Sequence, residues 1–424
     1  HHVLNKHQLD SIRKLPTILK FKQENYYTGP ALYFREAIAN ELKEWCKENN
    51  TDLYGDGLKI YTTIDSRMQQ YAEEAVEEHL KELQGYFFKE KKGRKKAPYS
   101  NRITQEQVDE ILTRTMKQSD RYRIMKKAGA SDAQIEKAFN TPEEMSVFTW
   151  NGEKDTIMTP MDSIRYYKHF LRAGFMSMNP HNGHVKAYVG GPNHHYFKYD
   201  MAMVGRRQVG STIKPYVYTL AMENGYSPCD EARHVEYTLI DENGKPWTPR
   251  NANTKRYGEM VTVKWGLANS DNWITAYLMS KLNPYSLKRL IESFGVRNRE
   301  IVPSVSLCLG PCEISVGEMV SAYTAFPNKG IRVAPLFVTR IEDNDGNVLA
   351  TFSPEMEEVI SVSSAYKMLV MLRAVINEGT GGRVRRLGVK ADMGGKTGTT
   401  NYNADGWFMG FTPSLVSGCW VGGD

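Results

Sequence analysis

Apolar and polar positions along the chain fall into two patterns. From Phe175 onward, short β-rich runs are separated by segments whose apolar residues recur every three or four positions. The first pattern is typical of strands and the second of amphipathic helices, so this part predicts a compact domain of both. Residues 85–165 are instead charged and polar, with helical patches at 105–123 and 132–139. They predict an inserted helical segment.

The first 84 residues predict two helices around one strand. A helix is expected over residues 31–48, after the turn signal Gly29-Pro30, and residues 58–64 alternate as in a strand. Asp65 or Ser66 should then cap a second helix. The predicted core face of that helix comprises Met68, Tyr71, Ala72, Ala75, Val76, Leu80 and Leu83.

The C-terminal part predicts a hairpin, then helices, then more strands. The hairpin joins residues 175–178 to 185–189 through an Asn182-Gly183 turn. Helices are expected over residues 211–224, 264–282 and 363–378, and strands over residues 396–400, 407–411 and 415–421. Helices between an early hairpin and late antiparallel strands predict an α+β fold, an antiparallel β-sheet flanked by helices.

Composition narrows the functional classes only slightly. Of 424 residues, 41% are hydrophobic and 25% charged, as in ordinary globular proteins. The net charge of +6 is compatible with an anionic polymer or a membrane surface as partner. No apolar run reaches the roughly 18 residues that would cross a bilayer. The basic run 89–96 contains no aromatic residue, so it predicts a solvated loop and no nucleic-acid partner.

The cysteines predict neither a disulfide framework nor a metal site. There are five, an odd and sparse set, and no histidine pair accompanies them at zinc spacing. A bridge between Cys308 and Cys312 is an open alternative. No metal and no cofactor are therefore expected.

Three short motifs carry the candidate chemistry. Each alone is weak, because a second Ser-x-x-Lys, from Ser364 to Lys367, falls in a predicted helix and is interpreted as ordinary helix surface. The ordered set of three is far more specific. The motifs are Ser211-Thr212-Ile213-Lys214, Ser270-Asp271-Asn272 and Lys396-Thr397-Gly398-Thr399.

The first motif fits a serine nucleophile with a lysine base. Positions i and i+3 on a helix share a face, and a serine hydroxyl attacks well only when a base removes its proton. Lys214 can be that base if burial beside another cation lowers its pKa, and Lys396 is the candidate cation. Backbone N–H groups at the helix N-terminus would face a developing oxyanion.

The third motif also resembles the end of a phosphate-binding loop. Such a loop needs a glycine at position 390, where Lys390 stands, so the nucleotide-binding interpretation is rejected. As a strand, the motif offers an ammonium group, hydroxyls at alternate positions for a carboxylate, and a glycine where a substrate backbone can approach. Taken singly, Ser270 could be a helix cap and the threonines plain β-formers.

Together these motifs resemble those of the penicillin-binding proteins and serine β-lactamases. The flanking segments 58–65, 206–218, 310–330, 378–382 and 394–400 are similar to the bifunctional class A penicillin-binding proteins. The resemblance covers roughly residues 25–80 and 170–424. One departure is Val209, where the family usually has proline. The resemblance implies the β-lactamase/transpeptidase-like fold.

The resemblance implies catalytic roles for five residues. Ser211 would attack the carbonyl between the two terminal D-alanines of a peptidoglycan stem peptide, with Lys214 as base. Ser270, helped by Lys396, would relay the proton to the leaving amine. Asn272 would hydrogen-bond the substrate backbone and Lys214. An amine from a neighbouring stem would then complete the cross-link, and β-lactams would acylate Ser211.

Substrate binding is implied for the last motif. Thr397, Gly398 and Thr399 would line the substrate strand, with the two threonines holding the terminal carboxylate. Backbone N–H groups of Ser211 and Thr399 would form the oxyanion hole.

The resemblance also implies an organisation into four parts. Residues 1–56 would be a linker and the tail of a glycosyltransferase domain that this chain lacks, and residues 57–84 the strand and helix leading into the transpeptidase domain. Residues 85–165 would be the inserted helical, charged segment, which matches no catalytic element of the family. Residues 166–424 would be the penicillin-binding transpeptidase domain, truncated at its C-terminus.

The implied setting is the bacterial cell envelope. The full-length protein would have a single membrane anchor, lie on the outer, periplasmic face of the cytoplasmic membrane and also polymerise glycan. Its partners would be donor and acceptor stem peptides, β-lactams and other cell-wall synthesis proteins. Two alternatives stay open: a hydrolase, either a β-lactamase or a D,D-carboxypeptidase, and a non-enzymatic β-lactam sensor.

Overall fold

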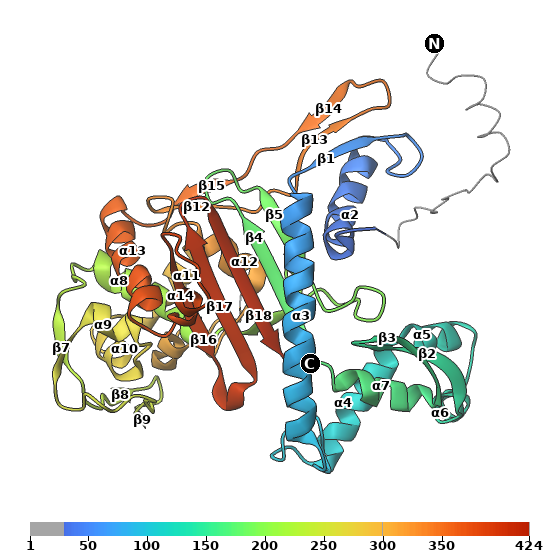
Figure 1. Ribbon diagram of the computed structural model, residues 1–424, viewed down its shortest axis with the longest axis horizontal. Helices are drawn as coiled ribbons and strands as arrows, with labels where there is room; N and C mark the ends of the chain where they lie inside the picture. The colour runs from blue at the N-terminus through green and yellow to red at the C-terminus, as the bar shows by residue number, and fades with distance from the viewer. Residues whose placement is uncertain (1–28, 299, 424) are drawn as a thin grey trace, which may run out of the picture.

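A five-stranded antiparallel sheet lies at the centre of the computed structural model, which describes residues 29–298 and 300–423 (Figure 1). Its strand order is β16-β17-β18-β4-β5, so the C-terminal strands pair with a hairpin from far earlier in the chain. This arrangement confirms the predicted α+β fold with an antiparallel sheet. The strands are β4 (Arg172–Met178), β5 (Val185–Val189), β16 (Gly394–Thr399), β17 (Asp405–Thr412) and β18 (Leu415–Gly422).

Helices cover both faces of this sheet. On one face lies the long helix α3 (Ser66–Lys91), which Asp65 caps by accepting hydrogen bonds from the N–H groups of Arg67 and Met68. On the other face lies α12 (Val316–Tyr323), so close that a Cβ at Gly418 would stand 2.6 Å from Val320 Cγ2. The β4–β5 part of the sheet is therefore covered on both sides, whereas Thr399 of β16 and Gly406 of β17 are exposed on the face that carries α3.

A helical lobe packs against the β16 edge of the sheet. It comprises α8 (Lys214–Glu223), α9 (Val263–Ala268), α10 (Asn272–Met279), α11 (Pro284–Ser293) and α13 (Val362–Asn377), followed by α14 (Arg383–Arg386). Short two-stranded ribbons border it: β6 (Arg206–Gln208) with β11 (Glu313–Ser315), β7 (Glu231–Arg233) with β10 (Met260–Thr262), β8 (Leu239–Ile240) with β9 (Pro246–Trp247), and β12 (Ile331–Val333) with β15 (Met356–Glu358).

Two of the predicted helices are broken at the motifs. The helix expected over residues 211–224 begins as a 3₁₀ turn, η1 (Gly210–Ile213), and becomes α-helical only at Lys214. The helix expected over residues 264–282 stops at Ser270, whose φ of 54° is left-handed and cannot continue a right-handed helix. In both places the irregular backbone is at a candidate catalytic serine.

Residues 85–165 form a separate lobe that contains more than helices. The helix α3 extends into this region, and a hairpin of β2 (Glu143–Thr149) and β3 (Gly152–Met158) was not predicted. The patch 105–123 is divided at Ser119, whose extended backbone ends one helix and whose hydroxyl caps the next. The helices are α4 (Gln105–Gln118), α5 (Asp120–Lys127), α6 (Asp132–Phe139) and α7 (Pro160–Lys168).

The predicted N-terminal helix is part of the main core. In α2 (Leu32–Glu48) the side chain of Phe34 is 2% exposed and meets the ring of Tyr188 edge-on at 6.2 Å. Residues 1–28, the first half of the predicted linker, lie outside the described residues. After α2, β1 (Lys59–Thr62) forms a small three-stranded sheet with β13 (Val338–Glu342) and β14 (Val348–Thr351).

The sequence analysis also made predictions about the cysteines and about membrane-spanning segments. The five cysteines are all free thiols, so the open alternative of a bridge between Cys308 and Cys312 is not realised. Within residues 29–298 and 300–423, none of the helices combines the length and the apolar character that a membrane span needs.

We expect Phe34→Ala to lower the free energy of unfolding by about 3–5 kcal/mol, because it leaves a cavity in the main core. Glu44→Ala, an exposed position of the same helix, is the control and should change it by less than about 0.5 kcal/mol. Urea unfolding followed by tryptophan fluorescence measures both. Equal effects of the two variants would show that α2 does not belong to the cooperative core.

Candidate active site

The candidate nucleophile lies on the 3₁₀ turn η1. In such a turn the side chains at i and i+3 are eclipsed, so Ser211 and Lys214 lie on the same side. The N–H of Lys214 donates to the carbonyl of Ser211, and Pro215 occupies the first turn of α8, where its missing N–H costs nothing. The half-buried hydroxyl of Ser211 makes no hydrogen bond to the described part of the chain. It is therefore available to a substrate.

Main-chain atoms hold this turn on two sides. A Cβ at Gly210, whose φ is +51°, would stand 2.8 Å from the carbonyl oxygen of Thr399, and one at Gly310 would stand 2.1 Å from that of Gly210. A Cβ at Gly398 would meet Thr212 Cγ2 at 2.7 Å. Gly398 therefore lets the strand approach the nucleophile turn, a different contact from the substrate approach that the sequence suggested.

Lys214 is a buried ammonium group with three oxygen acceptors. Its Nζ donates to Asn272 Oδ1 at 2.7 Å and to the carbonyl oxygen of Ser270 at 2.5 Å, and lies 3.4 Å from Ser270 Oγ. Burial disfavours the charged form and lowers the pKa of Lys214 to about 7, although the carboxylate of Asp271 opposes this shift. A lysine with this pKa is partly neutral at pH 7 and can accept a proton.

Lys396 brings a second ammonium group to the same hydroxyl. Its Nζ donates to Ser270 Oγ at 2.9 Å and to the carbonyl oxygen of Thr397 at 2.7 Å. Burial, and secondarily the charge of Lys214, hold the pKa of Lys396 well below its usual value. The Ser270 hydroxyl thus lies between two lysines, and Lys396 is the cationic neighbour that the sequence analysis proposed for Lys214.

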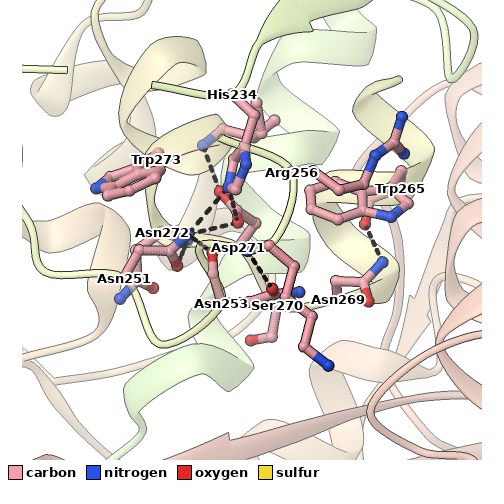
Figure 2. A network of polar contacts seen from close by, with 12 residues as sticks. His234, Asn251, Asn253, Arg256, Trp265, Asn269, Ser270, Asp271, Asn272 and Trp273 are labelled. Carbon is pink, nitrogen blue, oxygen red and sulfur yellow. Dashed lines mark hydrogen bonds and ion pairs between the residues drawn. The ribbon is translucent and has the colours of Figure 1, made fainter. Parts of the chain in front are cut away.

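The second motif forms the turn between α9 and α10. Asp271, and not Ser270, caps α10: its Oδ1 accepts from the N–H of Ile274 at 2.9 Å. Asn272 points its Oδ1 at Lys214 and donates through Nδ2 to the carbonyl oxygen of Arg250 at 2.6 Å. Figure 2 shows the polar contacts around this turn, including Asn251, which the sequence did not single out.

The threonines of the third motif lie on β16, the edge strand of the sheet. Lys396 and Gly398 point inward and are buried, whereas Thr397 is half-buried and Thr399 is exposed. Thr380 Oγ1 lies 2.7 Å from Thr397 Oγ1 and adds a hydroxyl that the sequence missed. Its only signal was the segment 378–382, which resembles the family but carries no recognisable chemistry of its own.

The structure therefore assembles all three motifs at one place. Direct hydrogen bonds join Lys214, Ser270, Asn272 and Lys396, while Ser211, Gly398 and Thr399 belong to the crossing of the nucleophile turn and the edge strand. Within the described ranges, we find no group of three or more His, Cys, Asp or Glu side chains placed to hold a metal ion. The second Ser-x-x-Lys lies in α13, where Ser364 is buried, so its interpretation as helix surface was wrong, and Lys367 donates to the carbonyl of Tyr226.

Comparison with protein families gives two matches. Residues 173–417 match the penicillin-binding protein transpeptidase domain. The chain belongs to this transpeptidase family. Residues 94–171 match the penicillin-binding protein middle domain, so the lobe expected as an insertion corresponds to a recognised domain of these proteins.

Curated relatives and solved structures agree with this membership. Penicillin-binding protein 1A of Aquifex aeolicus is 30% identical, over 96% of this chain and 55% of the relative, and that of Neisseria meningitidis is 28% identical, over 93% and 52%. The chain spans about half the length of these relatives. Penicillin-binding protein 1A of Haemophilus influenzae has the same fold, with a TM-score of 0.70 and 22% identity over 99% of this chain and 69% of that one. PonA1 of Mycobacterium tuberculosis follows, with a TM-score of 0.62 and 22% identity over 93% and 84%.

Because the pKa of Lys214 is lowered in the folded transpeptidase domain, the free energy of unfolding should depend on pH. Between about pH 7 and 10.5 the unfolded chain keeps a proton on Lys214 that the folded chain has lost, so stability rises with pH there. We expect the free energy of unfolding of the wild type, relative to Lys214→Met, to grow by about 1 kcal/mol per pH unit between pH 7.5 and 9.5. Urea unfolding at several pH values measures this, and parallel curves for the two proteins would contradict it.

Proposed function

We propose that this chain is the D,D-transpeptidase part of a cell-wall enzyme, and that it cross-links peptidoglycan stem peptides through an ester on Ser211. The observation that carries the proposal is the Ser270 hydroxyl between the buried Nζ atoms of Lys214 and Lys396, behind the nucleophile turn. Membership of the transpeptidase family supports it. The choice of D-alanyl-D-alanine as substrate is part of the proposal.

In the first step neutral Lys214 accepts the Ser211 proton while Oγ bonds to the carbonyl carbon of the penultimate D-alanine. The oxyanion that forms accepts hydrogen bonds from the backbone N–H groups of Ser211 and Thr399. Thr399 lies on β16, which packs against the turn that carries Ser211. Each such donor typically contributes about 10²–10³ in rate. Thr397 and Thr399, with Thr380 beside them, hold the terminal carboxylate.

The second step breaks the C–N bond and releases the terminal D-alanine. Lys214, now protonated, passes a proton to Ser270 Oγ, and Ser270 gives its own proton to the leaving nitrogen. Lys396 stabilises the Ser270 oxygen during this transfer, and Asn272 orients Lys214. The amine of a neighbouring stem then attacks the ester, and its proton returns along the same path to Ser211.

The proposal also covers parts of the protein outside this chain, and these rest on its relatives. Because the chain spans about half of proteins named penicillin-binding protein 1A, we include in the proposal a glycosyltransferase domain and a membrane anchor outside this chain. The site would then work at the outer face of the cytoplasmic membrane, with other cell-wall synthesis proteins as partners. PonA1 of Mycobacterium tuberculosis is described in complex with penicillin V, which supports β-lactams as inhibitors here.

We expect penicillin to give a single stable adduct on Ser211, because its strained amide mimics the donor peptide and its ring blocks the acceptor amine. Ser211→Ala should lose the adduct, whereas Ser364→Ala, in the second Ser-x-x-Lys, should keep it. Peptide mass spectrometry checks both. Fast turnover of a chromogenic cephalosporin would favour a hydrolase, and unchanged cross-linking of supplied glycan strands by Ser211→Ala would favour a sensor.

We expect the rate of β-lactam acylation to fall about tenfold per pH unit below pH 7, because protonated Lys214 cannot accept the Ser211 proton. Lys214→Met should lose at least about 10²-fold in rate and the pH dependence with it. Lys367→Met is the matched control and should behave as the wild type. Stopped-flow acylation with a fluorescent penicillin measures the profile; a flat wild-type profile from pH 5.5 to 8 would refute Lys214 as the base.

A further inference from the structure

A buried histidine–aspartate pair lies directly behind the Ser270 turn. His234 Nε2 donates to Asp271 Oδ2 at 2.8 Å, and both side chains are 0% exposed. Asn251 Nδ2 donates to the same oxygen at 2.6 Å, and the other carboxylate oxygen caps α10. Figure 2 shows His234 above Asp271, with Asn251 beside them. The carboxylate is thus held by donors from three separate segments.

The ring of His234 is fixed in orientation, but only one of its two nitrogens has a hydrogen-bond partner among the described residues. Its ring lies against Trp265 and Trp273, with centroids at 5.2 and 4.9 Å. Because the carboxylate can only accept, the hydrogen is on Nε2, and Nδ1 has no hydrogen-bond partner among the described residues. A buried nitrogen without a partner costs stability, so stability alone does not explain a histidine here.

We propose, on the basis of the proposed function, that His234 and Asp271 are positioning residues for the base. Asp271 fixes the turn that presents Ser270 and Asn272 to Lys214 and supplies a buried negative charge within electrostatic reach of it. His234 holds that carboxylate through Nε2–H and moderates its charge. Neither residue contacts the reacting atoms.

The geometry connects the pair to Lys214 by two routes. Asp271 is the residue between Ser270 and Asn272, which supply the three oxygen atoms that accept hydrogen bonds from the Lys214 ammonium. The charge of Asp271 favours protonated Lys214 against the effect of burial, which is larger. Among the described residues, the other charged or titratable groups that face this region include Tyr218 of α8, Cys308 of η2 (Val305–Leu309), Lys396 of β16, Arg256, which lies over Trp265, and Tyr257, which packs against Trp273.

Asp271→Asn removes the charge and keeps the shape and the capping oxygen, while its Nδ2 replaces the oxygen that accepted from His234 and Asn251. Lys214 then loses its proton more easily, so the acid limb of the acylation profile should move by about one pH unit toward lower pH. With each profile normalised to its own plateau, the variant should react up to tenfold faster than the wild type near pH 5.5. A loss of folding or of turn geometry alone would lower the plateau and leave the limb in place.

A pair of His234 variants tests the hydrogen bond separately. His234→Phe keeps a ring between the two tryptophans but has no donor, so Asp271 becomes more negative toward Lys214 and the limb should move toward higher pH. His234→Gln retains an N–H near the place of Nε2 and should restore a profile close to that of the wild type. The comparison of His234→Phe with His234→Gln tests the positioning role even if Asp271→Asn fails to fold.

The experiment uses the whole 424-residue chain and a fluorescent penicillin, with thermal unfolding recorded for each variant. Opposite shifts for Asp271→Asn and His234→Phe, with rescue by His234→Gln, would support the proposal. Unshifted limbs in Asp271→Asn and His234→Phe, or equal limbs for His234→Phe and His234→Gln, would overturn it while leaving the proposed function intact. A wild type that is not acylated at Ser211 would overturn the proposed function and this inference with it.

Discussion

The burial of two lysine ammonium groups around one serine hydroxyl is the constraint on which the rest of this structure depends. Burial, together with the neighbouring like charge, lowers the pKa of both lysines, so a proton acceptor is available in the site near neutral pH. The carbonyls of Ser270 and Thr397 and the amide of Asn272 satisfy the hydrogens that remain. The left-handed backbone at Gly210 and Ser270 lies where the chain turns to bring these groups together.

Most of the fold could be predicted because its signals are local. The strand segments of β17 and β18, the hairpin of β4 and β5 and most of the apolar face of α3 each follow from neighbouring residues, and the antiparallel sheet follows from their order. Tyr71 and Ala75 of the predicted α3 face are exposed. The hairpin β2–β3 was missed because its burial pattern is mostly exposed, so it shows no apolar alternation. Phe34 gave no sign of core packing, because its partner Tyr188 is far along the chain.

The candidate site residues could be found in the sequence for a different reason. Ser211, Lys214, Ser270 and Lys396 lie in short motifs whose order is informative even though their contacts are not visible in the sequence. Ser211 and Lys214 share one side although the first turn is 3₁₀ and not α-helical, because positions i and i+3 lie on one side in either helix. Thr380, Asn251 and His234 have no motif, and only tertiary packing brings them to the site.

The crossing of main-chain segments at Gly210, Gly310 and Gly398 has a consequence for adaptation. Walls made of backbone cannot be reshaped by exchanging one side chain, since any added Cβ collides with a carbonyl or with the turn itself. Under selection by an inhibitor that reacts at Ser211, the accessible changes are confined to outward-facing side chains such as Thr380 and Thr399. Those positions also bind the natural donor in the proposed mechanism, so each escape from the inhibitor would carry a loss of physiological turnover.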